Sequence, residues 1–473
     1  MTNNGKGRFS SNTGFIMAAV GSAVSLGNIW AFPYKMGANG GFAFLIIYIV
    51  MAIFIGYPLM LGEISLGRKT GKAAIGAYNE ANPRFTVNGI IETIVPFFLL
   101  CFFCVLGGII LKYTTANFCD IVHLKWGLRN TDSKTYYDAF ISDPKLTIIF
   151  MLIFIVATAI IVLRGVQRGI ELFCSLAMPA VYIMLAIIAI RSCTLPGAID
   201  GLKFMFQPDM SVFANMGWLK VFAVAGSQMF FSLSLASGAL IAYGSYMRKE
   251  DNLEHSAAWI PAFDTIAALL AGLAVLPAVF AMGVKPGQGT GMLFVSLQTV
   301  FDSMGFMGPI FGFIFYLLVF LAAFSSCIGL MEGFISTIMD RRIRMGKTVN
   351  RPFTVWIITM LTVCGGVLVC VDKMGLNSSM WKPFGMDSWL QVFDLSAEGL
   401  LMPLGGLLMA ILLGWSRRGY LDDEIRQGSS YKSKKFVDVC WRYIAPVFML
   451  FILVYQFGSY FLSNMGWFQT LFG

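Results

Sequence analysis

Apolar residues in this chain come in long runs separated by short polar segments. A helix needs about 20 mostly apolar residues to cross the hydrocarbon core of a bilayer, and about eleven runs approach that length. These runs are Gly14–Tyr34, Gly41–Leu66, Gly89–Phe118, Leu146–Leu163, Gly169–Ile190, Gly217–Tyr246, Ala257–Met282, Gly308–Met339, Phe353–Val371, Trp389–Trp415 and Tyr443–Leu462. The pattern predicts an all-α integral membrane protein with about 11 transmembrane helices in a single domain, residues 1–463.

Two of these runs are interrupted by small and polar residues. The first span contains Gly21–Asn28 (GSAVSLGN), and the sixth contains Phe231–Gly238 (FSLSLASG). Unwound backbone is tolerated in a membrane only where it faces protein or water, and paired interrupted helices mark the binding site of many transporters. We expect helices 1 and 6 to unwind at mid-membrane within a 5+5 inverted repeat. Repeat one is about 10–191, repeat two about 217–416, and an extra helix covers about 441–463.

The composition agrees with a membrane protein and narrows its function. Hydrophobic residues make up 57% of the chain and charged residues 12%, and the mean hydropathy is +0.74. If the N-terminus is cytoplasmic, 22 of the 34 Lys and Arg residues fall on the cytoplasmic side, with the N-terminal segment and every second loop. This asymmetry predicts a cytoplasmic N-terminus in the cell inner (plasma) membrane and, with an odd number of spans, an outer C-terminus. The net charge of +9 therefore reflects topology and not nucleic-acid binding.

Motifs for catalysis or ATP use are missing from the sequence. The two histidines, His123 and His255, lie in loops, and no Walker motif occurs. Cys101 and Cys104 form a CxxC inside an apolar run, where packing is the expected role. We predict that the protein is not an enzyme and that any energy coupling uses an ion gradient.

Two outer segments separate the spans. Cys119–Lys145 is polar, whereas Lys285–Met307 contains the apolar run Met292–Phe301. This run is expected to form a re-entrant or surface helix, which would act as a lid if it lies above a central cavity.

Oxygen donors are concentrated in the interrupted segments. Unwinding exposes carbonyl groups that suit a hard cation and N–H groups that suit a carboxylate. Asp264, in the seventh span, is the strongest single candidate because an ionisable group at mid-membrane depth is usually functional. The plain alternative for the serines is helix packing with hydroxyls bonded back to their own helix. Glu63 and Glu332 lie nearer helix ends, where they could simply tie helices together.

These residues resemble those of a known family. Gly21–Tyr34 (GSAVSLGNIWAFPY) is similar to the first-helix motif of the neurotransmitter:sodium symporters, including the bacterial leucine transporter, and Phe231–Leu235 resembles their sixth helix. The resemblance covers nearly the whole chain and implies one or two bound Na⁺ ions. The implied first sodium site consists of Ala23, Asn28, Ser232 and Asp264. The implied second site consists of Gly21, Val24, Ala322, Ser325 and Ser326.

The same resemblance implies a substrate site beside the first sodium ion. Its lining would be Ala23, Ser25, Leu26, Gly27, Leu99, Phe103, Phe231, Ser232, Ser234, Ser237 and Leu330. Ser25 stands where monoamine transporters have Asp, so a zwitterionic amino acid is favoured over a bare amine. Phe103 replaces a Tyr whose hydroxyl contacts the substrate carboxylate in relatives. Asp264 stands where many chloride-dependent members have Asn, so we expect chloride not to be required.

The gates depart from the family pattern at two positions. The implied inner gate is made of Lys6, Phe9, Tyr246 and Asp340, with a Lys6–Asp340 ion pair in which Lys6 replaces the usual Arg. At the outer gate Ala31 replaces the usual Arg, and Lys35, one helical turn further on, is expected to pair with Asp394 instead.

The sequence therefore predicts a sodium-coupled secondary active symporter for a small zwitterionic solute, most simply an amino acid, that works by alternating access. The alternatives are a sodium-independent carrier or exchanger and a non-transporting substrate sensor of the same fold. The expected partners are the substrate and the lipid bilayer, without nucleic acid and without an obligate protein partner.

Overall fold

The computed structural model describes residues 7–128, 131–209, 211, 217–283, 291–376, 382–428 and 430–462. Within these ranges all regular secondary structure is helical. The α-helices of the first half are α1 (Asn12–Ala23), α2 (Phe32–Ala38), α3 (Phe42–Met51), α4 (Tyr57–Thr70), α5 (Ala74–Ala81), α6 (Thr86–Ile121), α7 (Ser133–Ser142), α8 (Pro144–Leu163), α9 (Leu172–Cys193) and α10 (Ala198–Phe206). Those of the second half are α12 (Trp218–Ser232), α13 (Ala239–Ser245), α14 (Leu253–Ala281), α15 (Leu297–Ser303), α16 (Gly308–Arg344), α17 (Arg351–Val371), α18 (Trp389–Asp394), α19 (Met402–Ile411), α20 (Asp422–Arg426), α21 (Lys434–Val439) and α22 (Ala445–Phe461).

Short π-helical turns continue many of these helices without interrupting the span. They are η1 (Gly27–Ala31), η2 (Ala52–Gly56), η4 (Val166–Glu171), η5 (Met292–Ser296), η9 (Leu395–Leu401), η10 (Leu412–Ser416) and η11 (Cys440–Ile444). Each shifts the register of the following residues on the helix surface.

The described residues contain nine continuous helices that are long and apolar enough to span a membrane. A tenth candidate is the pair Asn12–Ala23 and Gly27–Ala38, bent by 49° at its break. The predicted sixth span is divided into α12 and α13 by residues 233–238. The all-helical membrane fold is thus confirmed, with both interrupted spans where the sequence placed them.

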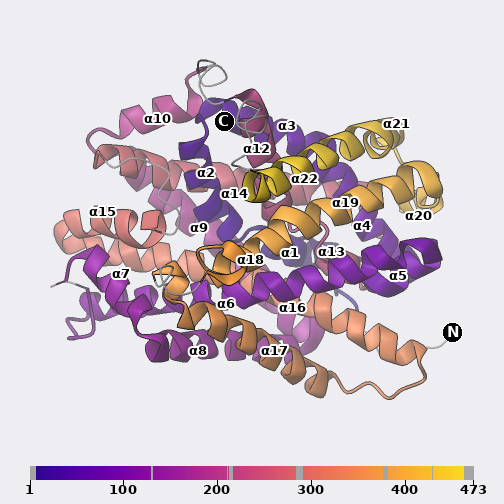
Figure 1. Ribbon diagram of the computed structural model, residues 1–473, viewed down its shortest axis with the longest axis horizontal. Coiled ribbons are helices and arrows are strands. Elements are labelled where there is room, and N and C mark those ends of the chain that lie inside the picture. Colours follow the sequence, from indigo (N-terminus) through magenta and orange to yellow (C-terminus); the bar gives the residue numbers. More distant parts are fainter. Residues whose placement is uncertain are drawn as a thin grey trace.

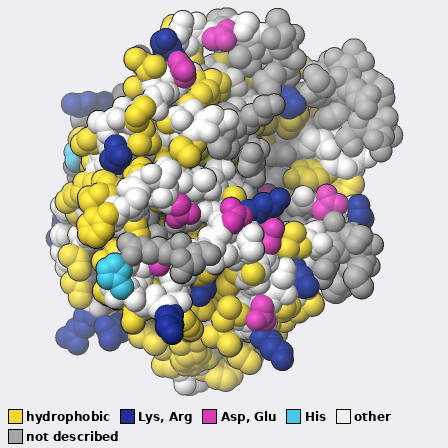
Figure 2. Space-filling model, turned by 90° about the vertical axis from the view of Figure 1, so that its left-hand side faces the viewer, with side chains coloured by type: hydrophobic (Ala, Val, Ile, Leu, Met, Phe, Trp, Pro, Cys, Tyr) yellow, Lys and Arg dark blue, Asp and Glu magenta, His cyan; other side chains and the backbone are white. Residues whose placement is uncertain are grey.

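The two interrupted spans lie inside the bundle (Figure 1). Helix α1 packs against α9, α14 and α16, and α13 packs against α4 and α16. Large apolar side chains are exposed on the outer helices, such as Leu176 on α9 (78% exposed), Met360 on α17 (64%) and Val447 on α22 (67%). Figure 2 shows broad areas of such hydrophobic side chains on one face. A surface of this kind suits lipid rather than water.

The loops hold more structure than the sequence predicted. The polar segment after α6 contains α7, and the short helix α5 follows α4. Met292–Phe301 is helical as expected, formed by η5 and the start of α15, and it packs against α7 and α16. Its action as a lid stays a prediction, and residues 284–290, which precede it, lie outside the described part.

Candidate functional site

At the break in the first span, freed backbone N–H groups are bonded by polar side chains of the same segment. Helix α1 ends at Val24, whose backbone is extended (φ −68°, ψ 104°). The backbone N–H of Ser25 donates to Asn28 Oδ1 at 3.0 Å, and the N–H of Gly27 donates to Ser25 Oγ at 2.9 Å. Two peptide groups freed by unwinding are therefore satisfied without leaving the segment.

At the break in the sixth span, a freed backbone N–H group is bonded by a side chain from another helix. Ser234 (φ 51°) and Ala236 (φ 54°) adopt the left-handed conformation that non-glycine residues rarely take, and Gly238 (φ 69°) follows. The N–H of Ala236 donates to Glu63 Oε1 of α4 at 2.7 Å. Glu63 thus does more than tie two regular helices together, because its carboxylate caps the unwound backbone.

The two breaks meet at Asp264 of α14. Its carboxylate accepts hydrogen bonds from Asn28 Nδ2 (2.8 Å) in the first span and from Ser232 Oγ (2.9 and 3.1 Å) in the sixth. Tyr48 of α3 also donates to it, at 2.8 Å. All four side chains are fully buried. Asn28, Ser232 and Asp264, three of the four residues proposed for the first sodium site, are therefore in direct contact.

Tyr48 is a member of this cluster that the sequence reasoning missed. Its hydroxyl oxygen also lies 3.1 Å from Ser232 Oγ, within hydrogen-bond distance. A tyrosine within an apolar span needs a hydrogen-bond partner for its hydroxyl. This requirement was the feature of the sequence that could have pointed to Tyr48 as part of a polar cluster. Ala23, the fourth proposed ligand, is buried at the end of α1, where the carbonyl of Ser22 accepts from Ser234 Oγ at 2.9 Å. This bond links the two broken spans a second time.

A second group of oxygen atoms lies between the end of α1 and α16. Ser326 Oγ is within hydrogen-bond distance of the carbonyl oxygens of Gly21 (3.1 Å), Val24 (3.4 Å) and Ala322 (3.1 Å). Ser325 Oγ donates to the Ala322 carbonyl at 2.9 Å. The five residues proposed for the second sodium site thus come together, and three carbonyls and two hydroxyls are the ligand types that a hard cation prefers.

The residues proposed for the substrate site lie around both breaks. The rings of Phe103 and Phe231 meet edge to face, with centroids 5.7 Å apart. An added Cβ on Gly27 would lie 3.1 Å from the Phe231 ring and 3.0 Å from Ser25 Oγ, so this position has room only for glycine without a shift of its neighbours. Ser237 Oγ donates to the Ser234 carbonyl at 2.6 Å. The remaining members of the set are buried in the surrounding apolar core, and they are Leu26, Leu99 and Leu330.

The ion pair proposed for the outer gate has a different acidic partner from the expected one. Lys35 Nζ lies 2.5 Å from Glu398 Oε1, so the prediction that Lys35 pairs with Asp394 is corrected to Glu398. Ser227 of α12 donates to the same Glu398 oxygen at 2.9 Å. Asp394 lines the same cavity of about 390 Å³ as Lys35 and Glu398. Glu398 follows Asp394 by four residues, so regular helical spacing would place both on nearly the same helix face. That spacing was the signal in the sequence that Glu398 could pair with Lys35 in place of Asp394.

Lys35 also connects this ion pair to the substrate residues. Its ammonium group lies 5.7 Å from the centroid of the Phe231 ring, within the range of a cation–π contact. One lysine of the first span therefore touches the sixth span and the tenth at once.

The residues proposed for the inner gate are held by aromatic packing around Phe9 and by hydrogen bonds. Phe9 is 1% exposed, its ring packs against Phe15, Tyr243 and Tyr246, and its N–H donates to the Tyr246 carbonyl at 3.2 Å. Asp340 Oδ2 accepts from the N–H of Ala73 at 2.6 Å. Lys6, the predicted partner of Asp340, lies outside the described residues.

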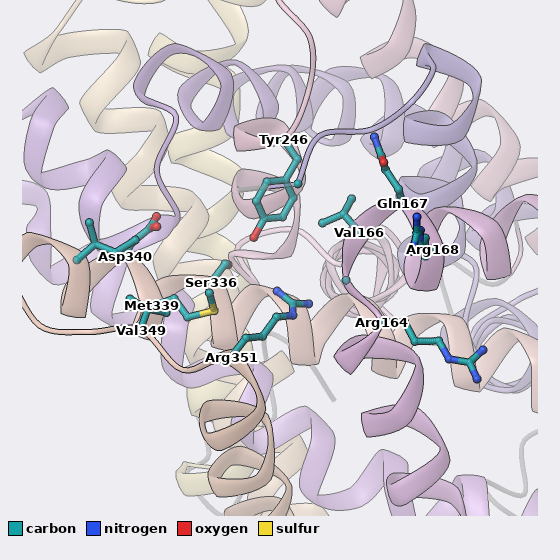
Figure 3. A pocket seen from close by; sticks show the side chains of 13 residues that line it. Arg164, Val166, Gln167, Arg168, Tyr246, Ser336, Met339, Asp340, Val349 and Arg351 are labelled. Carbon is teal, nitrogen blue, oxygen red and sulfur yellow. The ribbon is translucent and has the colours of Figure 1, made fainter. Parts of the chain in front are cut away.

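Glu332 and Arg351 add an ion pair that was not predicted for the inner gate. Tyr246 donates its hydroxyl to Glu332 Oε1 at 2.8 Å, and Arg351 Nη2 lies 2.6 Å from Glu332 Oε2. Figure 3 shows Tyr246 and Arg351 pointing toward each other beside a cavity of about 630 Å³, with Asp340 on its wall and Arg164 pointing away. Glu332 thus joins α16, α17 and the end of the sixth span beside this cavity.

The structure is that of a helical membrane protein with two interrupted spans. Oxygen groups lie at both breaks, and polar contacts lie on either side of them. This is the architecture of a secondary transporter. Residues 6–137 and 139–469 match the sodium:neurotransmitter symporter family, and the chain belongs to that family. It is accordingly a multi-pass sodium-dependent transporter and not an enzyme.

Two relatives and one solved structure show how far the similarity extends. An uncharacterised sodium-dependent transporter of Bacillus subtilis, YhdH, is 34% identical over 457 residues, covering 95% of this chain and 98% of the relative. One of Haemophilus influenzae is 30% identical over 480 residues, covering 98% of this chain and all of the relative. The crystal structure of MhsT in complex with L-phenylalanine superposes with a TM-score of 0.85 at 33% identity, covering 95% of this chain and 99% of MhsT.

Proposed function

We propose that the protein is a sodium-coupled symporter for a zwitterionic amino acid with an apolar side chain, driven by alternating access. The supporting observation is the Asp264 cluster, which places a carboxylate and a hydroxyl beside the unwound backbone of both broken spans. A cation there would be held against a substrate carboxylate, so that each ligand improves the binding of the other. The apolar lining by Leu99, Phe103 and Phe231 and the L-phenylalanine bound to the similar protein MhsT support the substrate class.

Both oxygen groups fit Na⁺ by their donor chemistry. The first would use the Asp264 carboxylate, the Ser232 hydroxyl, the Ala23 carbonyl and the Asn28 amide oxygen. In this structure Asn28 directs its amide nitrogen to Asp264 and its oxygen to the Ser25 N–H, so serving as a ligand requires its amide to turn over. The second would use Ser325, Ser326 and the carbonyls of Gly21, Val24 and Ala322.

Asp264 also supports independence from chloride. A carboxylate beside the first Na⁺ supplies the negative charge that an Asn at this position would leave to an added anion. The proposal also includes a cytoplasmic N-terminus and a location in the inner membrane, which the distribution of basic residues supports. It further includes a division into two five-helix repeats, which the two broken spans support.

The substrate class is tested by thermal unfolding of the purified full-length protein. L-phenylalanine and L-leucine are expected to raise the unfolding midpoint in Na⁺ but not in K⁺. Phenethylamine, which lacks the carboxylate of phenylalanine, is expected to have no effect. Stabilisation by amino acids to the same extent in K⁺ would contradict sodium coupling, and stabilisation by phenethylamine would contradict the role of the carboxylate.

Transport itself is tested by counterflow of a labelled amino acid in proteoliposomes. Sodium-dependent counterflow that is unchanged when gluconate replaces chloride is expected. Binding without counterflow would favour the substrate sensor, which has the same fold without translocation.

The second sodium site is tested by Ser326→Ala. Loss of one oxygen ligand should lower the apparent sodium affinity about tenfold, equivalent to about 1.4 kcal/mol. Thr359→Val is the control, because within the described residues the Thr359 hydroxyl bonds only to the Val355 carbonyl of its own helix, at 2.9 Å. Equal sodium affinity in both variants would remove Ser326 from the site.

A further inference from the structure

Two buried glutamates lie against the unwound segment of the sixth span. Glu63 of α4 and Glu92 of α6 are 1% and 0% exposed. Glu63 Oε1 accepts from the Ala236 N–H, whereas Glu92 Oε1 accepts from the Tyr78 hydroxyl at 2.5 Å and from Asn88 Nδ2 at 3.2 Å. Both side chains therefore use one carboxyl oxygen for a well-defined hydrogen bond.

The second oxygen of each glutamate has no partner. Glu63 Oε2 and Glu92 Oε2 are both fully buried and make no hydrogen bond within the described residues. In the same part of the chain neither carboxyl forms an ion pair with Lys or Arg. Burying a charge without a cation costs free energy, and two such charges close together would cost still more because they repel each other.

Several contacts place the two glutamates around the same short stretch of backbone. A Cβ added at Gly405 of α19 would lie 2.9 Å from Ala236 Cβ and 3.5 Å from Glu92 Cγ. A Cβ added at Gly238 would lie 2.8 Å from the Glu92 carbonyl oxygen. Ala236 is thus bonded to Glu63 through its N–H, and its methyl group lies near Glu92 across the space beside Gly405. Residues 233–238 are thus held between α4 and α6.

We propose that Glu63 and Glu92 form a proton-binding site that holds one proton between them, and that this proton stabilises the unwound segment of the sixth span. The proton removes one of two like charges and gives an unpartnered carboxyl oxygen a hydrogen to donate. Glu63 can then keep its bond to Ala236 without repulsion from Glu92. The site shares no residue with either oxygen group assigned to Na⁺, and it goes beyond the proposed function because it adds a third ligand, H⁺.

Few other titratable groups act on this pair. Tyr78 of α5 faces it and donates to Glu92, and Asn88 of α6 adds an uncharged donor. The unwound segment contributes only the Ala236 N–H, and α19 contributes Gly405. Proton loss from the pair would therefore add a second negative charge that the neighbouring groups do not balance.

The direction of the pH effect follows from this arrangement. A carboxyl that is protonated in the folded protein and ionised in the unfolded chain contributes stability at low pH, and that contribution is lost as the pH rises through its folded-state pKa. The unfolding midpoint of the wild type is therefore expected to fall between about pH 6 and about pH 9, and Glu92→Gln, which imitates the protonated form, should flatten this slope.

The test combines two measurements on the full-length protein in K⁺ without substrate. Infrared spectroscopy should show the carbonyl band of a protonated carboxyl at neutral pH in the wild type, and both Glu92→Gln and Glu63→Gln should lose it. Glu80→Gln is the control, because Glu80 on α5 is 42% exposed and paired with Lys72, so it should keep the band and the wild-type slope.

Two outcomes would overturn the proposal. One is the absence of a protonated-carboxyl band in the wild type at neutral pH. The other is a Glu92→Gln protein whose midpoint depends on pH as steeply as that of the wild type. Glu63→Gln supplies the infrared result independently if Glu92→Gln does not fold. Neither measurement involves sodium or an amino acid, so a negative result leaves the proposed transport function untouched.

Discussion

The first and sixth spans are both interrupted, but their freed peptide groups are satisfied in different ways. In the first span Ser25 and Asn28 bond to backbone N–H groups of the same segment. In the sixth span Ala236 takes a left-handed conformation and its N–H bonds to Glu63 of another helix. The first break is therefore locally encoded, whereas the second depends on its surroundings.

This difference shows which break is suited to respond to other parts of the molecule. A segment held by its own side chains keeps its shape when neighbouring helices move. A segment held by α4 and α6 changes when the charge or position of those helices changes. We expect the sixth span to carry conformational and pH effects, and the first to carry most of the oxygen ligands.

The largest effect is expected from Lys35→Met, which removes the contact that joins the two spans on the outer side. Glu398 would be left buried without its cation and close to Asp394. Removing one partner of a buried pair costs about 3–5 kcal/mol. Thermal unfolding should show a large loss of stability, together with faster release of bound amino acid.

The matched variant for this prediction is Lys35→Met combined with Glu398→Gln. Removing both charges should restore much of the lost stability, because no uncompensated carboxylate remains at Glu398. If Lys35→Met alone keeps wild-type stability and release rate, Lys35 is not part of the outer closure.

An intermediate effect is expected from Asp264→Asn, at the point where both breaks meet. Losing the negative charge next to a bound cation should lower sodium affinity roughly 100-fold, or about 3 kcal/mol. Added chloride should recover part of this affinity by replacing the missing charge. Sodium titrations followed by thermal shift, in chloride and in gluconate, measure both effects. Unchanged sodium affinity in gluconate would remove Asp264 from the site.

The smallest effect is expected from Ala236→Gly, which probes the strain in the sixth break alone. Glycine adopts a positive φ without penalty, so relief of strain should offset the loss of the buried methyl group. Ala239→Gly is the control, because Ala239 is the first residue of helix α13 and glycine weakens a helix by about 1 kcal/mol. The Ala239 variant should be less stable than the Ala236 variant by about that amount. Equal losses at both positions would mean that the left-handed backbone stores no strain.

The sequence alone determined the membrane fold and the positions of both breaks. Bilayer thickness sets the length of each apolar run, and a run of small and polar residues weakens a spanning helix wherever it occurs. These are local properties of the chain. Gly21, Ala23, Val24, Asn28 and Ser232 could be named because they lie within or directly beside the breaks. Asp264 was named as an ionisable group within an apolar span. Ala322, Ser325 and Ser326, in the eighth span, were assigned through the family resemblance.

Only the tertiary structure decided which distant side chains meet. The π-helical turn η9 begins directly after Asp394 and shifts the register of Glu398, so the carboxylate that reaches Lys35 was not fixed by helical spacing. The contacts of Glu63 with Ala236 and of Tyr48 with Asp264 depend on how each helix is rotated in the bundle. That rotation results from packing over the whole molecule, which no single segment encodes.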